Sequence, residues 1–277
     1  MPEQSVCHTN ALGRRSFLAF GAETALLGLL AILTAPVSVK AVQIAPEDPR
    51  LKTGRVTVPN YAGGLQCYSA RPAAQSGALG SVLVMHDILG LTPHFEDVAR
   101  RFALEGFAAL APDYASRYGG TPPDPDPARE IVGMATWPQM IADTNAALAW
   151  LRGQDHANGK LAAVGFGLGG SALGRAVMRL SDMTAAVLLY GRVPPVEHVR
   201  DIKTPLLLIY AGEDPVVNAD VPGFVDALHA AGQHPDIVTY SGARHGFDDD
   251  TQGVHYAPEA AKLAWARTVE FIRPLIG

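Results

Sequence analysis

Cysteine is nearly absent from this chain of 277 residues, which contains only Cys7 and Cys67. Charged residues are also few, at 18%, and the net charge is −5. No run of Lys or Arg stands out, so the sequence carries no basic footprint for nucleic acid or for an anionic membrane surface. A stabilising set of disulfides and an electrostatic nucleic-acid interface are both excluded as organising features.

The first 41 residues are typical of an export signal. Residues 14–18 (RRSFL) are a twin-arginine signature, and a mostly apolar stretch follows them up to Leu33. Residues 39–41 (VKA) place small side chains where a cleavage site needs them, so we expect cleavage near Ala41 and a periplasmic or secreted protein without stable membrane association. The alternative is an uncleaved membrane anchor, which Glu23 and the shortness of the apolar run disfavour. Cleavage removes Cys7 and leaves Cys67 without a partner.

After a linker at residues 42–52, the pattern predicts one α/β domain over residues 53–277. Segments 53–59 and 65–70, joined by Gly63 and Gly64, predict an antiparallel hairpin in which Cys67 is an ordinary packed residue. From residue 81 onward strands and helices alternate, which predicts a mainly parallel sheet covered by helices on both faces. The expected strands are 81–85, 107–111, 161–164, 185–190, 206–211 and 237–240, and the expected helices are 93–104, 137–151, 171–180, 223–231 and 258–275.

A segment rich in proline and glycine, residues 118–127 (YGGTPPDPDP), interrupts this alternation. So much Pro and Gly predicts irregular structure. Because the segment follows the carboxyl end of a strand, where ligands bind in open α/β sheets, we expect it to form a lid or a pocket wall.

Residues 161–174 (LAAVGFGLGGSALG) organise the predicted sheet. An apolar strand gives way to a cluster of glycines and then to a helix, as in the nucleophile elbow of the α/β-hydrolase fold, G-x-Nuc-x-G. Gly165 and Gly169 occupy the flanking positions, so the nucleophile position is Gly167, which has no side chain. The sequence therefore predicts an α/β-hydrolase elbow without its nucleophile.

The same letters also spell G-x-G-x-x-G through Gly165, Gly167 and Gly170, the fingerprint of dinucleotide binding. That motif requires an acidic residue at the end of the next strand, where this chain has Gly191 and Arg192. The motif also lies far from the first strand of the domain. An NAD(P)-binding protein is thus the remote alternative.

Asp214 and His245 are the candidates for the remaining members of a catalytic triad, whose order in this fold is nucleophile, acid, histidine. Each follows a predicted strand, so both are expected at the sheet edge that carries the elbow. The alternatives are a capping residue for Asp214 and a surface histidine for His245. Four other histidines lack metal-ligand spacing and are interpreted as structural or exposed: His86, His94, His198 and His255.

Asp87 lies in the loop after the strand 81–85. In α/β-hydrolases this loop supplies one oxyanion donor, and the residue after the nucleophile supplies the other. The backbone N–H groups of Ile88 and Leu168 are therefore the expected donors. The alternative for Asp87 is an ordinary turn residue that precedes a helix.

Eight stretches together resemble the dienelactone hydrolase (carboxymethylenebutenolidase) family, in its twin-arginine-exported branch. They are residues 86–94 (HDILGLTPH), 97–101 (DVARR), 111–114 (APDY), 119–122 (GGTP), 164–170 (VGFGLGG), 190–192 (YGR), 210–214 (YAGED) and 245–247 (HGF). The resemblance implies opening of cyclic enol-lactones and related esters through an acyl-enzyme, with no metal or organic cofactor. It also implies catalytic roles for Asp214 and His245, a Cys where Gly167 stands, and a Glu where Asp87 stands, which that family uses to help activate the thiol.

Both departures, at Gly167 and Asp87, affect the interaction between the thiol and its activating carboxylate. The leading hypothesis is a hydrolase of small esters or lactones whose covalent mechanism is lost or replaced by water that His245 activates. The second is a non-catalytic periplasmic binder of small lactones or carboxylates. Ser171 is a poor substitute nucleophile because it lies a helical turn past the elbow, and the candidates for a carboxylate clamp, by location, are Arg117, Arg192 and Arg244.

Overall fold

The computed structural model describes residues 43–277 except residues 75 and 76. The predicted export signal at residues 1–41 lies outside these described residues. Within them, we find no helix with the length and hydropathy needed to cross a bilayer.

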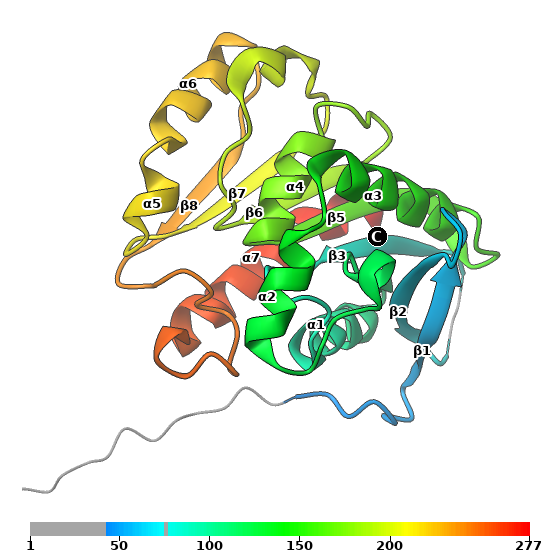
Figure 1. The fold of residues 1–277 in the computed structure, drawn as a ribbon. Helices are drawn as coiled ribbons and strands as arrows, with labels where there is room; N and C mark the ends of the chain where they lie inside the picture. Colours follow the sequence, from blue (N-terminus) through cyan, green and yellow to red (C-terminus); the bar gives the residue numbers. More distant parts are fainter. Residues whose placement is uncertain (1–42, 75–76) are drawn as a thin grey trace, which may run out of the picture. The chain divides into compact units, whose positions relative to one another are not determined.

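Eight strands form one mixed sheet in the order β1-β2-β4-β3-β5-β6-β7-β8 (Figure 1). Strands β1 and β2 pair as an antiparallel hairpin, β2 pairs antiparallel with β4, and all pairs from β4 to β8 are parallel. The predicted α/β-hydrolase fold with its N-terminal hairpin is confirmed. The strands are Leu51–Val58 (β1), Leu65–Pro72 (β2), Leu79–Met85 (β3), Ala108–Pro112 (β4), Ala157–Phe166 (β5), Ala185–Leu189 (β6), Leu206–Ala211 (β7) and Asp236–Tyr240 (β8).

Helices cover both faces of the sheet, with α1 and α7 on one face and α3, α4 and α6 on the other (Figure 1). Alternation along β3 shows why: Val82 and Val84 pack into the first layer, whereas Leu83 and Met85 pack into the second. A strand with apolar residues on both faces needs cover on both faces. The helices are Pro93–Leu104 (α1), Pro125–Gly133 (α2), Trp137–Arg152 (α3), Leu168–Ala176 (α4), Pro215–Asn218 (α5), Val221–Ala230 (α6) and Pro258–Ile276 (α7).

The prediction of irregular structure over residues 118–127 was wrong for its last part, because α2 begins at Pro125. The Asp124 side chain caps this helix by accepting a hydrogen bond from the Asp126 N–H. Proline is tolerated in the first turn of a helix, where its missing N–H has no intrahelical acceptor in any case. The prolines of this segment therefore start a helix and do not interrupt one.

Helix α4 also differs from its predicted bounds, since it begins at Leu168 and not at residue 171. The reason is the elbow itself, where the chain turns at Gly167 and enters the helix at the next residue. As a result, the first N–H groups of α4 lie directly at the carboxyl edge of the sheet.

Candidate active site

Three parallel strands bring the predicted triad positions to one edge of the sheet. Gly167 follows β5 directly, Asp214 lies three residues past β7, and His245 lies five residues past β8. The carboxyl ends of parallel strands share an edge, which is where open α/β sheets bind ligands. All three positions line one cleft of about 540 Å³.

The elbow backbone favours glycine for two separate reasons. Gly167 has φ 51° and ψ −111°, a left-handed conformation that strains any residue with a side chain. At Gly165 and Gly169, a Cβ atom would lie only 2.6 Å from the Gly169 carbonyl oxygen and 2.2 Å from the Met85 carbonyl oxygen, respectively. Internal packing of the turn therefore accounts for these glycines without a bound dinucleotide.

The space above Gly167 lies between two groups that a nucleophile would use. A Cβ atom at this position would be 3.3 Å from His245 Nε2, 3.3 Å from Asp87 Cβ and 3.6 Å from Tyr190 Cε2. The backbone thus still points toward the place where a nucleophilic side chain would meet its base.

Asp214 and His245 form a close pair. His245 Nδ1 lies 2.6 Å from Asp214 Oδ2, while Asp214 Oδ1 accepts a hydrogen bond from the Val217 N–H at 3.2 Å. One carboxylate oxygen therefore caps α5 and the other orients the imidazole. A carboxylate accepts from Nδ1–H, so the lone pair of the neutral ring is on Nε2, which faces Gly167. Asp214 is buried, and the Tyr190 ring packs edge-on against His245 at 4.8 Å between ring centroids.

The two expected oxyanion donors both line the cleft. Among the described residues, the N–H groups of Ile88 and Leu168 have no hydrogen-bond acceptor. For Leu168 the cause is its place as the first residue of α4, where an N–H has no carbonyl one turn earlier to bond. Both groups are free to bind a negative oxygen.

Asp87 lies beside the nucleophile position, and its Oδ1 accepts a hydrogen bond from the Leu89 N–H at 2.7 Å. Burial raises the pKa of Asp87 to about 6, because the charged carboxylate loses water there. Asp87 is therefore neutral in acid and becomes a carboxylate close to neutral pH.

The Ser171 hydroxyl is already committed to the backbone. It donates to the Gly167 carbonyl oxygen at 3.0 Å and accepts from the Arg192 N–H at 2.8 Å. Although Ser171 lines the cleft, its oxygen holds the elbow and the chain after β6 together. This position agrees with its interpretation as a poor substitute nucleophile.

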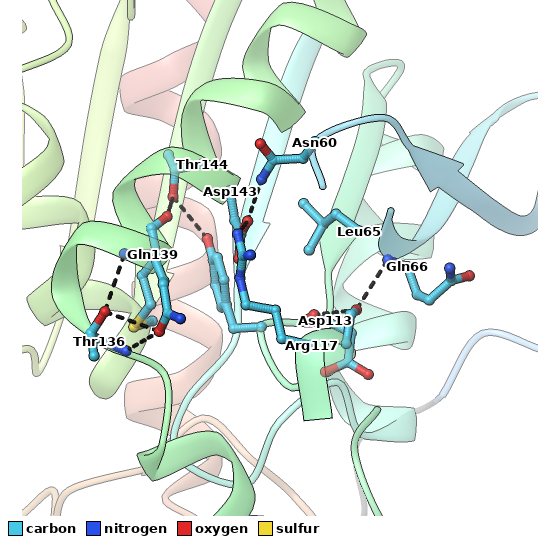
Figure 2. Close-up of polar contacts among 12 residues, drawn as sticks. Asn60, Leu65, Gln66, Asp113, Arg117, Thr136, Gln139, Asp143 and Thr144 are labelled. Atoms are coloured by element: carbon cyan, nitrogen blue, oxygen red, sulfur yellow. Dashed lines mark hydrogen bonds and ion pairs between the residues drawn. The ribbon is translucent and has the colours of Figure 1, made fainter. Parts of the chain in front are cut away.

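The structure separates the candidates for a carboxylate clamp. Arg192 lines the cleft, whereas Arg244 is exposed and does not line it. Figure 2 shows Arg117 reaching toward Asp143, and their Nη2–Oδ1 distance is 2.6 Å. Arg117 also stacks at 3.7 Å over the Tyr61 ring, so it is engaged away from the cleft.

Sequence reasoning missed several residues of the cleft wall, above all Trp137 and Arg175. Trp137 starts α3, and Arg175 lies on α4 eight residues past the elbow. No residue of the described segment 118–127 lines the cleft, so the expected lid or pocket wall is not found there.

Two further groups behave as interpreted from the sequence. Cys67 is buried in β2, and burial raises the pKa of its thiol. His86 is buried, and its Nε2 accepts a hydrogen bond from the Tyr114 N–H at 3.1 Å. Both are structural.

His94 is also buried, but the fold surrounds it with carboxylates that the sequence did not bring to notice. Its ring nitrogens lie 3.5 Å from Asp248 and 3.4 Å from Asp249, with Asp250 at 3.8 Å. Burial by itself would lower the pKa of His94, but Asp248 and Asp250 raise it to about 10. His94 is therefore the cation of this acidic cluster. The Tyr190 hydroxyl donates to Asp248, which connects the cluster to the ring that packs on His245.

These features define an α/β-hydrolase whose elbow lacks a nucleophile. The family model of the dienelactone hydrolase family matches residues 65–276, and the chain belongs to this family.

A carboxymethylenebutenolidase homologue of Methylorubrum extorquens is 30% identical over 285 residues, which cover 98% of this chain and 96% of the relative. A homologue of Salmonella typhi is 31% identical over 243 residues, covering 81% of this chain and 88% of the relative. Among solved structures, a dienelactone hydrolase homologue from Klebsiella pneumoniae has a TM-score of 0.73 at 28% identity and covers 79% of this chain and 97% of its own. The expected family is confirmed by these matches, and its twin-arginine-exported branch stays a prediction.

Proposed function

We propose that this protein hydrolyses small carboxylic esters or lactones with a water molecule that His245 activates in place of the missing thiol. The observation that carries the proposal is the position of His245 Nε2, 3.3 Å from where a Cβ of residue 167 would stand. A general base needs to lie within hydrogen-bond reach of the proton that it removes. A water molecule in the space above Gly167 meets that condition.

In the proposed reaction the water oxygen attacks the carbonyl carbon while His245 Nε2 takes the water proton. The carbonyl oxygen gains the negative charge and is bound by the N–H groups of Ile88 and Leu168. When the tetrahedral intermediate collapses, the C–O bond to the leaving group breaks and His245 returns its proton to that oxygen. Asp214 stabilises the imidazolium throughout.

The expected rate is modest. Triad hydrolases without one member retain about 10³–10⁴-fold catalysis over water, which comes from the oxyanion hole and binding. The same donors, and a histidine with its acid, are in place here, so a rate enhancement on the order of 10³-fold is expected.

Hydrolysis of p-nitrophenyl acetate and of an enol-lactone tests the proposal. The native protein should exceed the rate in buffer, and His245→Ala should abolish that excess. His229→Ala is the matched control, because His229 is exposed on α6 and does not line the cleft. Activity that survives His245→Ala would show that His245 is not the base.

The second candidate function is a non-catalytic binder of small lactones or carboxylates. It is favoured by the combination of an empty nucleophile position and an intact cleft of about 540 Å³. If the native protein matches buffer but binds lactones with equal affinity before and after His245→Ala, the binder function replaces the hydrolase.

We also propose export through the twin-arginine pathway, which residues 14–18 and 39–41 support. N-terminal sequencing of the protein from the periplasmic fraction should find a start close to residue 42. A full-length chain in the cytoplasm would contradict this proposal.

A further inference from the structure

A second cleft, of about 600 Å³, opens beside the active-site cleft. Trp137 and Arg175 line both clefts, so the two adjoin at these residues. The volume lies within the range of small-molecule binding sites. Neither the predicted triad nor the proposed reaction uses this space.

The wall of the second cleft is mainly apolar. Ile141 of α3, together with Met178 and Leu180 after α4, lines it beside the Trp137 ring. The first three are half-buried and pack against the core beneath, so they form a fixed surface. Trp137 itself is 37% exposed. A ligand with a hydrocarbon portion would cover this surface.

Arg175 stands where the two clefts adjoin and has no acidic partner among the described residues. Its guanidinium stacks at 4.2 Å over the Trp137 ring, and Nη1 donates to the Ser171 carbonyl oxygen at 2.9 Å. These contacts hold the side chain in place while leaving other N–H donors unused. Burial lowers the pKa of Arg175, which marks a guanidinium that has lost water without gaining a counter-charge.

Two other arginines, unlike Arg175, form ion pairs with acidic residues. Arg117 pairs with Asp143 and Arg152 pairs with Asp182, at 2.6 and 2.7 Å respectively. A half-buried guanidinium that is fixed in place and lacks such a partner is suited to bind an anion with two oxygens, because its planar fork matches a carboxylate.

We propose that the second cleft binds a medium-chain carboxylate, with its carboxylate group on Arg175 and its hydrocarbon chain against Trp137, Ile141 and Met178. The charged group and the apolar wall adjoin one another, so a single amphipathic ligand satisfies both. The proposed binding does not depend on the hydrolytic reaction, although Trp137 and Arg175 also line the active-site cleft.

Isothermal titration calorimetry of the purified chain with butanoate, hexanoate and octanoate tests the apolar wall. Each added methylene that is buried should tighten binding by up to about fourfold. Octanol, which has the chain but not the charge, should bind at least about tenfold more weakly than octanoate. Equal affinities across the series, or for octanol and octanoate, would overturn the proposal without any variant.

Arg175→Gln tests the charged group and should weaken octanoate binding by about tenfold or more. Arg200→Gln is the matched control, since Arg200 is an exposed arginine that lines neither cleft, and it should bind as the native protein does. Arg179→Gln tests the contribution of the other arginine that lines the second cleft. If Arg179→Gln abolishes binding and Arg175→Gln does not, the assignment to Arg175 is overturned. All of these measurements are made without turnover, so an inactive protein leaves them interpretable.

Discussion

Restoring the nucleophile by Gly167→Cys should convert this chain into an enzyme with burst kinetics. The substitution places a side chain on a backbone with φ 51°, and a left-handed conformation costs about 1–2 kcal/mol for a residue other than glycine. The new Cβ lies 3.3 Å from both His245 Nε2 and Asp87 Cβ, so His245 has to shift by a few tenths of an ångström. The His245 side chain is 48% exposed and has room to move. A total loss of about 1–3 kcal/mol in the free energy of unfolding follows.

The substitution should raise the rate of hydrolysis far more than this loss of stability lowers it. A thiol beside His245 forms a thiolate–imidazolium pair, which makes the sulfur a strong nucleophile. Loss of the nucleophile in a triad hydrolase costs about 10⁶-fold in kcat, so recovery of even a thousandth of that factor raises the rate about 10³-fold. Stopped-flow measurement with p-nitrophenyl acetate should show a burst of one equivalent of nitrophenol per chain. Mass spectrometry of the quenched protein should show one acetyl group.

Gly167→Ala is the matched control, because it carries the same backbone strain and the same Cβ without a thiol. Both variants should lose similar stability, and only the Cys variant should give a burst. The double variant with His245→Ala should lose the burst again. If Gly167→Cys is as stable as Gly167→Ala but gives no burst, the reasoning from the geometry of the elbow is refuted.

Two further predictions concern stability. Asp87→Asn keeps an acceptor for the Leu89 N–H but removes the charge. The pKa of Asp87 is about 6 in the folded protein against an ordinary 3.8, so the native state retains its proton longer. The stability that the neutral carboxyl contributes is complete below pH 3.8 and is lost as the pH rises through about 6. Urea denaturation should therefore show Asp87→Asn gaining about 1–3 kcal/mol on the native protein between pH 4 and pH 7.5, and parallel pH profiles would contradict this. Gly169→Ala should cost at least about 3 kcal/mol, since its Cβ would lie 2.2 Å from the Met85 carbonyl oxygen. The control Gly223→Ala in α6, where a Cβ meets nothing within 4 Å, should be neutral or stabilising, and equal losses for the two variants would contradict the packing argument.

The elements that build the sheet were largely predictable from the sequence. Helix α1 and strand β7 have their predicted bounds, because apolar periodicity and terminal residues mark both clearly. Helix α2 was missed because its prolines stand in the first turn, where proline starts a helix as readily as it interrupts one. Composition alone does not distinguish these two uses of proline.

The core of the candidate site was predictable for a geometric reason. Gly167, Asp214 and His245 each follow a strand in a parallel sheet, and the carboxyl ends of such strands meet at one edge. Order along the chain was therefore enough to place them together. The distances among them were not available from order, and neither was the 2.6 Å contact between Asp214 and His245.

The cleft walls depended on packing between distant elements. Its location after β4 made Arg117 a candidate for the carboxylate clamp, but its side chain forms an ion pair with Asp143 on α3. Arg175 gave no signal, because a residue two turns into a helix shows its surroundings only when α3 packs against α4 and brings Trp137 over it.

By itself, the sequence determined the order of the strands and of five helices, the elbow and the absence of a nucleophile at Gly167, because these properties are local or follow from periodicity along the chain. Tertiary structure alone decided whether Arg117 and Arg175 meet an acidic partner. Arg117 is neutralised by a carboxylate 26 positions away, whereas Arg175 meets an aromatic ring and no acid among the described residues. Pairing between residues far apart in the chain depends on distances of a few ångströms between side chains from separate elements, and those distances exist only after the layers have packed.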